Sequence, residues 1–242
     1  MSLTQSLSLR TLTRIQDRLK LHEAKGDQGG PYKVLTSAQG GAPVGQMRVL
    51  TGGPVRKVSY VSIVVPPIGL DSHMLIAFAP SDSALPHFTL DAVAVGPDSY
   101  AFHLDLIPRV DLAANVEYTN AVYSPLTPVA LDVRGRAGVS PSRITPIQFA
   151  VMSPWMLVHR TDETAFKGIG EAVDAYLDHW FGLIDKGISP ELVSKLHGGS
   201  LAERDARHLG AIFDPKIDPV WNNMDRLFGA EQSAWLRNEI PR

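Results

Sequence analysis

Hydrophobic and polar residues alternate along two neighbouring segments in the middle of the chain, His87–Val95 and Tyr100–Ile107. This alternation predicts two β-strands, and the turn-forming cluster Gly96-Pro97-Asp98-Ser99 between them predicts a hairpin. Side chains of a strand point to its two faces in turn. One face of the first strand would carry His87, Thr89, Asp91, Val93 and Val95, and the other Phe88, Leu90, Ala92 and Ala94.

Asp91 is a carboxylate in the middle of this apolar strand, and such a group is costly to bury unless it is protonated, paired or used. His103 and Asp105 share one face of the second strand. A two- or four-residue loop would place Asp91 opposite Leu104, whereas a three-residue loop would place it opposite His103 or Asp105. The sequence leaves this register open.

Further strand patterns precede the hairpin. Val55–Val65 is the strongest, and Pro66-Pro67 ends it. Consecutive strands with short connections predict a mostly antiparallel sheet. We expect about five to seven strands, the others being Tyr32–Leu35 and Gln46–Leu50 as short edge strands, Met74–Ala79, and Phe149–Val158, which Ser153-Pro154 interrupts.

Apolar residues spaced by three and four predict helices at both ends of the chain. The first is Ser6–Lys25, and the longest begins at a cap on Thr161 or Asp162 and ends at Gly187. Helices on both sides of an antiparallel sheet indicate an α+β layer architecture. Shorter helices are expected at Val116–Tyr123, from Ser189-Pro190-Glu191, at Leu201–Phe213 and from Asp218-Pro219, with irregular chain over the rest of Ala113–Val139.

The 242 residues, of which 44% are hydrophobic, can bury one large core or two small ones. Nothing in residues 55–242 looks like a linker, so we expect one domain over residues 1–242. Its parts would be an N-terminal helix with a Gly- and Pro-rich segment (1–54), the sheet (55–160) and a helical part (161–242).

The charge pattern limits which classes of partner and which cellular compartment we expect for this protein. A net charge of -2 without a long basic run argues against nucleic acid, and no apolar stretch reaches the ~18 residues of a membrane span. Arg10, Arg14 and Arg18 interrupt the N-terminus, which therefore lacks a secretory apolar core. We expect a cytoplasmic protein; a start with Arg and Ser and no early acid leaves plastid import as the alternative. The oligomeric state stays open.

The chain contains no cysteine, which excludes disulfides, protein-bound iron–sulfur clusters, thiolate metal sites and cysteine nucleophiles. His103 and Asp105 offer two metal ligands without a visible third, so we expect no metal site. Gly168-Ile169-Gly170 lies within a predicted helix and follows no strand, so it indicates helix packing rather than dinucleotide binding. Redox chemistry would therefore need electrons from a partner or from a loosely held cofactor.

The segment PHFTLDAVAV, followed by a strand and then by LDLIPRVDL, resembles the ferredoxin-dependent bilin reductase superfamily, which includes red chlorophyll catabolite reductase. Weaker matches extend the resemblance over Val55 to Glu239. The resemblance implies an α/β/α sandwich with an antiparallel sheet. It also implies an oxidoreductase without a bound cofactor, which reduces a linear tetrapyrrole such as biliverdin by a radical mechanism. Electrons would come from reduced ferredoxin and protons from carboxyl groups.

Within this resemblance, Asp91 matches the central acid that donates a proton to the substrate. Asp218 matches, within about one position, an Asp or Asn near the start of the last helix that faces the pocket. The competing interpretation of Asp218 is a helix N-cap, since Pro219 follows it. Substrate contacts are further expected from His87, His103, Asp105 and Arg109, the last because an Arg suits a propionate carboxylate.

Two departures from the family pattern bear on the reaction. Bilin reductases of the phycocyanobilin type carry a His and a Glu on the strand that corresponds to Ser59–Val61, and both are absent. Their partner His falls at Met74, while His73, one residue away, would point to the opposite face. These departures favour the chlorophyll-catabolite branch and leave a non-catalytic tetrapyrrole-binding protein as the alternative. A hydrolase or lyase is a third possibility, but no nucleophile is visible.

Overall fold

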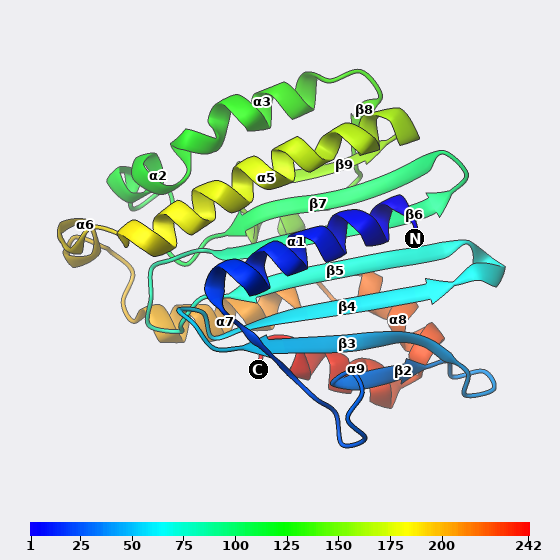
Figure 1. Cartoon of the computed structure of the whole chain (residues 1–242). Coiled ribbons are helices and arrows are strands. Elements are labelled where there is room, and N and C mark those ends of the chain that lie inside the picture. The colour runs from blue at the N-terminus through cyan, green and yellow to red at the C-terminus, as the bar shows by residue number, and fades with distance from the viewer.

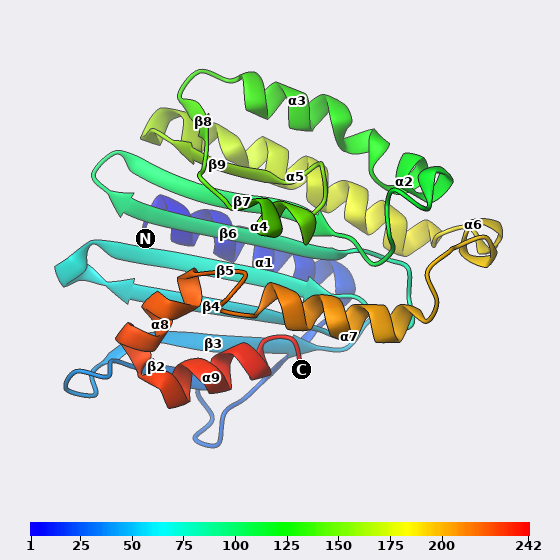
Figure 2. The ribbon, with the colours of Figure 1, turned by 180° about the vertical axis from the view of Figure 1, so that it is seen from behind.

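A nine-stranded antiparallel sheet forms the centre of the computed structural model, which describes all 242 residues (Figures 1 and 2). The order across the sheet is β1-β3-β4-β5-β6-β7-β9-β8, with β2 also pairing with β3. The strands are β1 (His22–Ala24), β2 (Lys33–Thr36), β3 (Pro43–Thr51), β4 (Lys57–Val65), β5 (Leu70–Phe78), β6 (His87–Gly96), β7 (Ser99–Ile107), β8 (Val139–Pro141) and β9 (Leu157–Thr161).

Helices cover both faces of the sheet, so the predicted α+β class and the α/β/α sandwich are confirmed. Figure 1 shows the face covered by α1 (Leu3–Leu19) and α5 (Glu163–Lys186), with α2 (Val116–Val122) and α3 (Thr127–Gly135) beside α5. Figure 2 shows the other face, which carries α4 (Pro146–Ala150), α7 (Leu201–Ile212), α8 (Val220–Phe228) and α9 (Ala230–Glu239). The remaining helices are α6 (Pro190–Ser194) and the 3-10 turns η1 (Pro66–Ile68) and η2 (Ser124–Leu126). No helix has both the length and the apolar character needed to cross a bilayer.

The face under α1 and α5 holds the larger core. Alternation along β6 sends Phe88, Leu90 and Ala92 to this side, as predicted, and all three are fully buried. Ile15 of α1 and Trp180 of α5 pack into the same core. Each fully buried side chain of this size contributes about 1.5–3 kcal/mol, so this face supplies most of the hydrophobic stabilisation.

The opposite face is anchored through the end of the chain. Side chains of β4 and the residue before it donate to three successive carbonyls: Lys57 Nζ to Glu239 at 2.6 Å, Ser59 Oγ to Ile240 at 3.1 Å and Arg56 to Pro241 at 2.8 Å. These bonds hold the end of α9 against the sheet.

The sheet is wider than the five to seven strands predicted, because β1 and β8 have only three residues each and show no alternation. The helix predicted at Ser6–Lys25 is wrong at both ends, since α1 runs from Leu3 to Leu19. Lys20 ends it in the left-handed conformation (φ 57°), and the chain then enters β1.

The strand predicted at Phe149–Val158 is also wrong. A capping box between Thr145 and Gln148 starts helix α4 there, and the next strand begins only at Leu157. The chain predicted as irregular after Tyr123 contains α3, which has a Pro in its first turn. The single last helix is two helices, because Gly229 (φ 81°) separates α8 from α9.

Candidate functional site

The register of the β6–β7 hairpin determines what Asp91 faces. Gly96 pairs with Ser99 across a two-residue turn, and a bulge between Ala94 and Gly96 then shifts every following pair by one residue. Asp91 consequently lies opposite His103 on β7, and on its other side it lies opposite Met74 of β5. Without the bulge, the same turn would have placed Leu104 there and turned His103 to the other face.

Asp91 and His103 lie on the floor of a cleft between the sheet and helices α7 to α9. This central cleft holds about 870 Å³ of space free of protein atoms, part of it open to solvent. Its walls are mostly apolar, as is usual for small-molecule sites. They include Val61, Ile63, Met74, Ile76, Val93, Ile107, Met152, Ile212, Phe213, Val220, Trp221, Met224 and Leu236.

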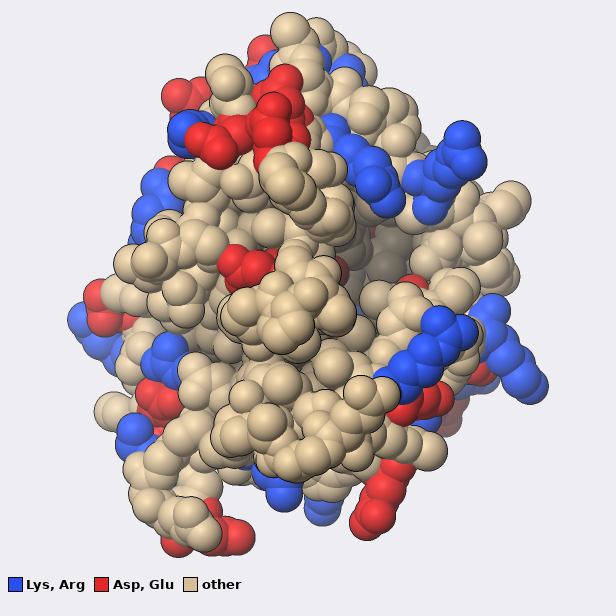
Figure 3. All heavy atoms as spheres, turned by 90° about the vertical axis from the view of Figure 1, so that its right-hand side faces the viewer, with Lys and Arg blue, Asp and Glu red and all other residues tan.

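The central cleft continues beneath α4. An adjoining cleft of about 500 Å³ shares His103, Met152, Ile212 and Asp218 with it and reaches Val158 of β9. A third, wider hollow shares Ile144, Met156 and Val158 with the second. Together they form an elongated groove across the sheet from β4 to β9. Figure 3 shows a hollow in the surface at this end of the molecule, on the side of α4 and α8, with basic side chains above and below it.

The Asp91–His103 pair is close but incompletely bonded. Asp91 Oδ2 lies 3.5 Å from His103 Nδ1, while Asp91 Oδ1 and His103 Nε2 are buried without any partner. Burial by itself lowers the pKa of His103, but the carboxylate of Asp91 and the charges of Asp105 and Asp218 outweigh it, so that the pKa is raised. The pair therefore favours an imidazolium beside a carboxylate.

Asp218 faces both clefts from the segment before α8. Its Oδ1 accepts the backbone N–H of Val220 at 3.1 Å and the Nε2 of Gln148 at 3.4 Å. Burial raises the pKa of this carboxyl, and the charge of Asp91 adds to the effect. The N-cap of α8 is Pro219, so the prediction of Asp218 as the N-cap is wrong by one residue. Asp218 still bonds the N–H of Val220, the first residue of the helix, and it lies in the cleft.

His87 and Arg109, both predicted to contact a substrate, do not reach the cleft. His87 Nδ1 accepts the N–H of Ala79 at 2.9 Å, and its Nε2 lies 2.9 Å from Asp205 of α7. Arg109 Nε lies 3.0 Å from the same carboxylate oxygen, and all three side chains are buried. Burial lowers the pKa of His87 to about 4, so the imidazole is neutral. This buried network attaches α7 to the sheet.

Asp105 is likewise a structural residue. It is fully buried, and it accepts the N–H of Ser153 at 2.9 Å and the Oγ of Ser153 at 2.5 Å. These bonds fix the loop between α4 and β9 next to Met152, which lines the cleft. Asp105 therefore positions a wall of the cleft but does not line it.

His73 points to the face under α1, as its one-residue offset predicted. Its Nδ1 lies 2.7 Å from the hydroxyl of Tyr60 and its Nε2 lies 2.5 Å from Asp71. His103 is therefore the histidine that pairs with Asp91 on the neighbouring strand. No group of three or more His, Asp or Glu residues is arranged to hold a metal ion.

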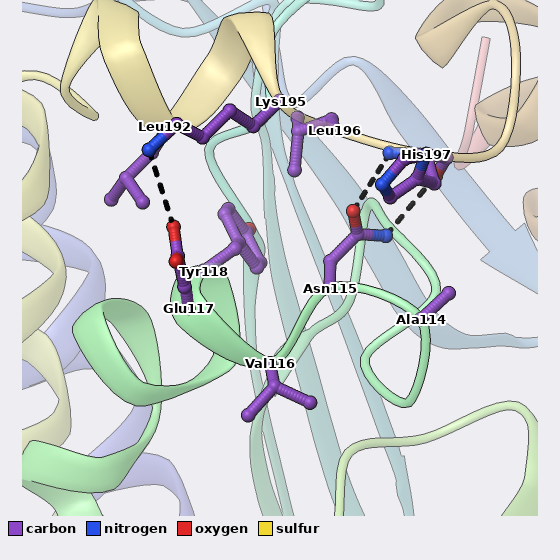
Figure 4. Close-up of a pocket in the computed structure, with 9 residues that line it drawn as sticks. All are labelled: Ala114, Asn115, Val116, Glu117, Tyr118, Leu192, Lys195, Leu196 and His197. Carbon is purple, nitrogen blue, oxygen red and sulfur yellow. Dashed lines mark hydrogen bonds and ion pairs between the residues drawn. The ribbon is translucent and has the colours of Figure 1, made fainter.

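A separate hollow, drawn in Figure 4, lies between α2 and the chain around the end of α6 and shares no residue with the central cleft. Its polar groups are bonded to one another: the Asn115 side chain accepts the N–H of His197 and donates to its carbonyl, and Lys195 lies 3.7 Å from Glu117. Because these polar groups already bond to one another and join two loops, the hollow is a weaker candidate for a ligand site.

Several residues that shape the groove were not predicted from the sequence. Met152 lies in the segment predicted as a strand and Gln148 directly precedes it, and the Thr145–Gln148 capping pattern was the signal that could have corrected this prediction. Asp205, in the amphipathic helix α7, is 118 residues from His87, and nothing local marks it as that residue's partner.

Comparison with solved structures confirms the fold. The crystal structure of phytochromobilin synthase from tomato in complex with biliverdin superposes with a TM-score of 0.75 and 17% sequence identity, over 98% of this chain and 82% of that chain. No protein-family model and no curated protein matches the sequence. The likeness therefore establishes the architecture that the sequence resemblance implied.

Proposed function

We propose that the chain binds a linear tetrapyrrole in the central cleft and reduces it with electrons from reduced ferredoxin. The observation that carries this proposal is a set of three ionisable groups, Asp91, His103 and Asp218, in an otherwise apolar cleft. The same fold holds biliverdin in the tomato enzyme. Acid and base groups in a water-poor pocket are typical of a proton-transfer site.

The shape and rim of the groove suit such a ligand. A linear tetrapyrrole is long, flat and largely apolar, and the groove runs across the strands of the sheet with mostly apolar walls. Its propionates would need cations at the surface rather than Arg109, which is buried against Asp205. Arg143 and Arg160 are exposed, form no ion pair and adjoin residues that line the groove, so they take this role.

Reducing one double bond takes two electrons and two protons. Ferredoxin is a one-electron carrier, so the electrons arrive singly and the protein must supply a proton to each reduced intermediate. Asp91, with His103, lies on the floor of the cleft, and Asp218 lies on its wall. A carboxyl group whose pKa is raised by burial, such as that of Asp218, stays protonated closer to neutrality and serves as a general acid.

A non-catalytic tetrapyrrole-binding protein is the second candidate. It is favoured by Met74, which occupies the position opposite Asp91 where the resemblance leads us to expect a His. A hydrolase is disfavoured, because the hydroxyls in the cleft belong to Ser72 and Thr89, and neither is hydrogen-bonded to an imidazole or a carboxylate.

Visible absorption spectra test the proposal. Biliverdin is added to the protein first alone and then with ferredoxin, its reductase and NADPH. A shifted spectrum that bleaches or moves after reduction supports the reductase, and a shifted spectrum without turnover supports the binding protein. Val93 lines the cleft, so Val93→Trp should abolish the shift, whereas Val95→Trp, on an exposed position of the same strand, should keep it. An unchanged parent spectrum contradicts tetrapyrrole binding.

A further inference from the structure

His103 is the one histidine that lines the central cleft and the adjoining cleft under α4. It comes from β7, whereas Met74 of β5 occupies the other position beside Asp91. We propose that His103 is a catalytic residue that holds the proton transferred to the bound tetrapyrrole, with Asp91 as the counter-ion that keeps the imidazole charged. This inference rests on the proposed function and assigns the proton to a particular atom.

The bonding of the ring supports this assignment. Nδ1 faces Asp91 at 3.5 Å, and Nε2 is buried in the cleft with no partner in the protein. A buried polar nitrogen without a partner is costly, so Nε2 is left for a ligand or a water molecule. In the imidazolium this nitrogen is an N–H donor directed into the cleft. The free Oδ1 of Asp91 is an acceptor for an N–H of the ligand.

The Asp91 carboxylate is the charged group in closest contact with the ring, and it stabilises the positive charge of the imidazolium. Asp91 faces it from β6, Asp105 from its own strand and Asp218 from the segment before α8. The neighbours from β9, the α4–β9 loop and α7 are the uncharged Val158, Met152 and Ile212. Asp91 therefore makes the main contribution that outweighs burial, and Asp105 and Asp218 add to it when they are ionised, since burial raises the pKa of both carboxyls.

Each half of the reduction transfers one electron and one proton to the ligand. One electron from ferredoxin converts the tetrapyrrole to a radical anion. The Nε2–H bond of His103 breaks, its proton forms a new bond to the ligand, and the imidazole becomes neutral beside the Asp91 carboxylate. A proton from solvent restores the imidazolium. A second electron and a second proton, from His103 again or from Asp218, complete the reduction of the double bond.

Asp91→Asn separates this mechanism from one in which Asp91 itself donates the proton. Without the carboxylate, burial lowers the pKa of His103, and the imidazole is neutral at pH 7. Single-turnover reduction of bound biliverdin should then be about 10²-fold slower than in the parent at pH 7. It should recover as the pH falls toward 5, where the imidazole regains its proton. His103→Gln should be slow at every pH.

Two controls keep the outcomes distinct. His22→Gln, at an exposed position on β1, should react like the parent. Nitrogen-15 NMR of the ligand-free parent should show both ring nitrogens of His103 protonated at pH 7, and Asp91→Asn should shift its titration to lower pH. Three results would each overturn the role of His103 alone: Asp91→Asn that stays slow at every pH, His103→Gln that reacts at the parent rate, or a neutral His103 at pH 7. A parent that neither binds nor reduces biliverdin overturns the proposed function as well.

Discussion

At the scale of single residues, Asp91 and His103 are polar groups that the fold leaves unsatisfied. Asp91 Oδ1 and His103 Nε2 are both buried and both lack a partner, although Asp105, on the same face two residues away, is fully bonded. A buried polar atom without a partner costs about 1–3 kcal/mol. A fold tolerates two adjacent costs of this kind where a ligand completes the bonding, which supports the proposal that a ligand binds at this pair.

Asp91→Asn should leave the fold and biliverdin binding nearly intact, because the change is isosteric and removes the charge alone. Turnover at pH 7 should fall by at least about 10²-fold, the usual scale for losing a positioned acid or its counter-ion. Stopped-flow absorbance under a ferredoxin reducing system measures this. Asp82→Asn, at an exposed position without hydrogen bonds, is the matched control. Reduction at the parent rate would remove the Asp91–His103 pair from the mechanism.

Asp218 combines a capping bond with a position in the cleft, and two substitutions separate these roles. Asp218→Ala removes the acceptor for Val220 N–H and should cost about 1 kcal/mol of unfolding free energy. Asp218→Ser retains an acceptor and should cost almost nothing. If the carboxyl also reaches the substrate, both variants lose turnover. Urea unfolding and single-turnover rates decide the matter, and full activity in Asp218→Ser would restrict Asp218 to the cap.

At the scale of elements, long and regular patterns were predictable and short ones were not. The stripe of α5 and its cap at Asp162 were predicted correctly, as was the alternation of β6. By contrast, β1, β8 and α4 have three to five residues, too few for a period to show. Tertiary pairing and a capping box decide their conformation.

The candidate site depended on one such local detail. The sequence identified Asp91, His103 and Asp218, but the bulge after Ala94 brings the first two together, and no residue type announces it. His87, Asp105 and Arg109 were predicted from their face or type, yet each is bonded within the core. Sequence spacing shows which side of a strand a residue occupies, whereas its partners depend on helices that lie far away in the chain.

Lys57→Met tests whether the anchored chain end positions α9 over the cleft. The Lys57 ammonium, whose pKa burial lowers to about 8, is still charged at pH 7 and donates to the carbonyl of Glu239. Its loss leaves that carbonyl unbonded and should cost about 1–3 kcal/mol of unfolding free energy. Biliverdin binding should weaken too, since Leu236 of α9 lines the cleft. Lys186→Met, at an exposed position without an ion pair, should change neither property.

At the scale of the whole molecule, the two helical layers are attached to the sheet by different means. Helices α1 and α5 pack through a continuous apolar core, whereas α7 combines apolar contacts of Leu209 and Ile212 with the buried His87–Asp205–Arg109 network. Apolar packing is almost indifferent to pH, but a buried network of ionisable groups is not. The attachment of α7 should therefore weaken in acid, as should the buried His73–Asp71 pair under α1.

The sign of that response follows from His87. In the unfolded chain its pKa is near the ordinary 6.5, and in the folded protein burial lowers the pKa to about 4. The unfolded chain therefore takes up a proton first as the pH falls. Unfolding free energy should be undiminished by this group above about pH 6.5 and should decline toward pH 4, by up to about 1.4 kcal/mol per pH unit. The raised pKa of His103 has the opposite sign and acts above its unfolded value, outside this window.

His87→Gln removes this titration and should flatten the pH dependence of unfolding between pH 6.5 and 4, at the expense of lower stability at neutral pH. Urea unfolding at a series of pH values, followed by tryptophan fluorescence, gives the slopes. Other buried histidines with lowered pKa, His73, His159 and His208, contribute in the same direction, so the difference between variant and parent is the informative quantity. His22→Gln should keep the parent slope. Equal slopes in His87→Gln and the parent would show that the network is not the acid-sensitive part of the fold. An NMR resonance of His87 that titrates near 6.5 in the folded parent would lead to the same conclusion.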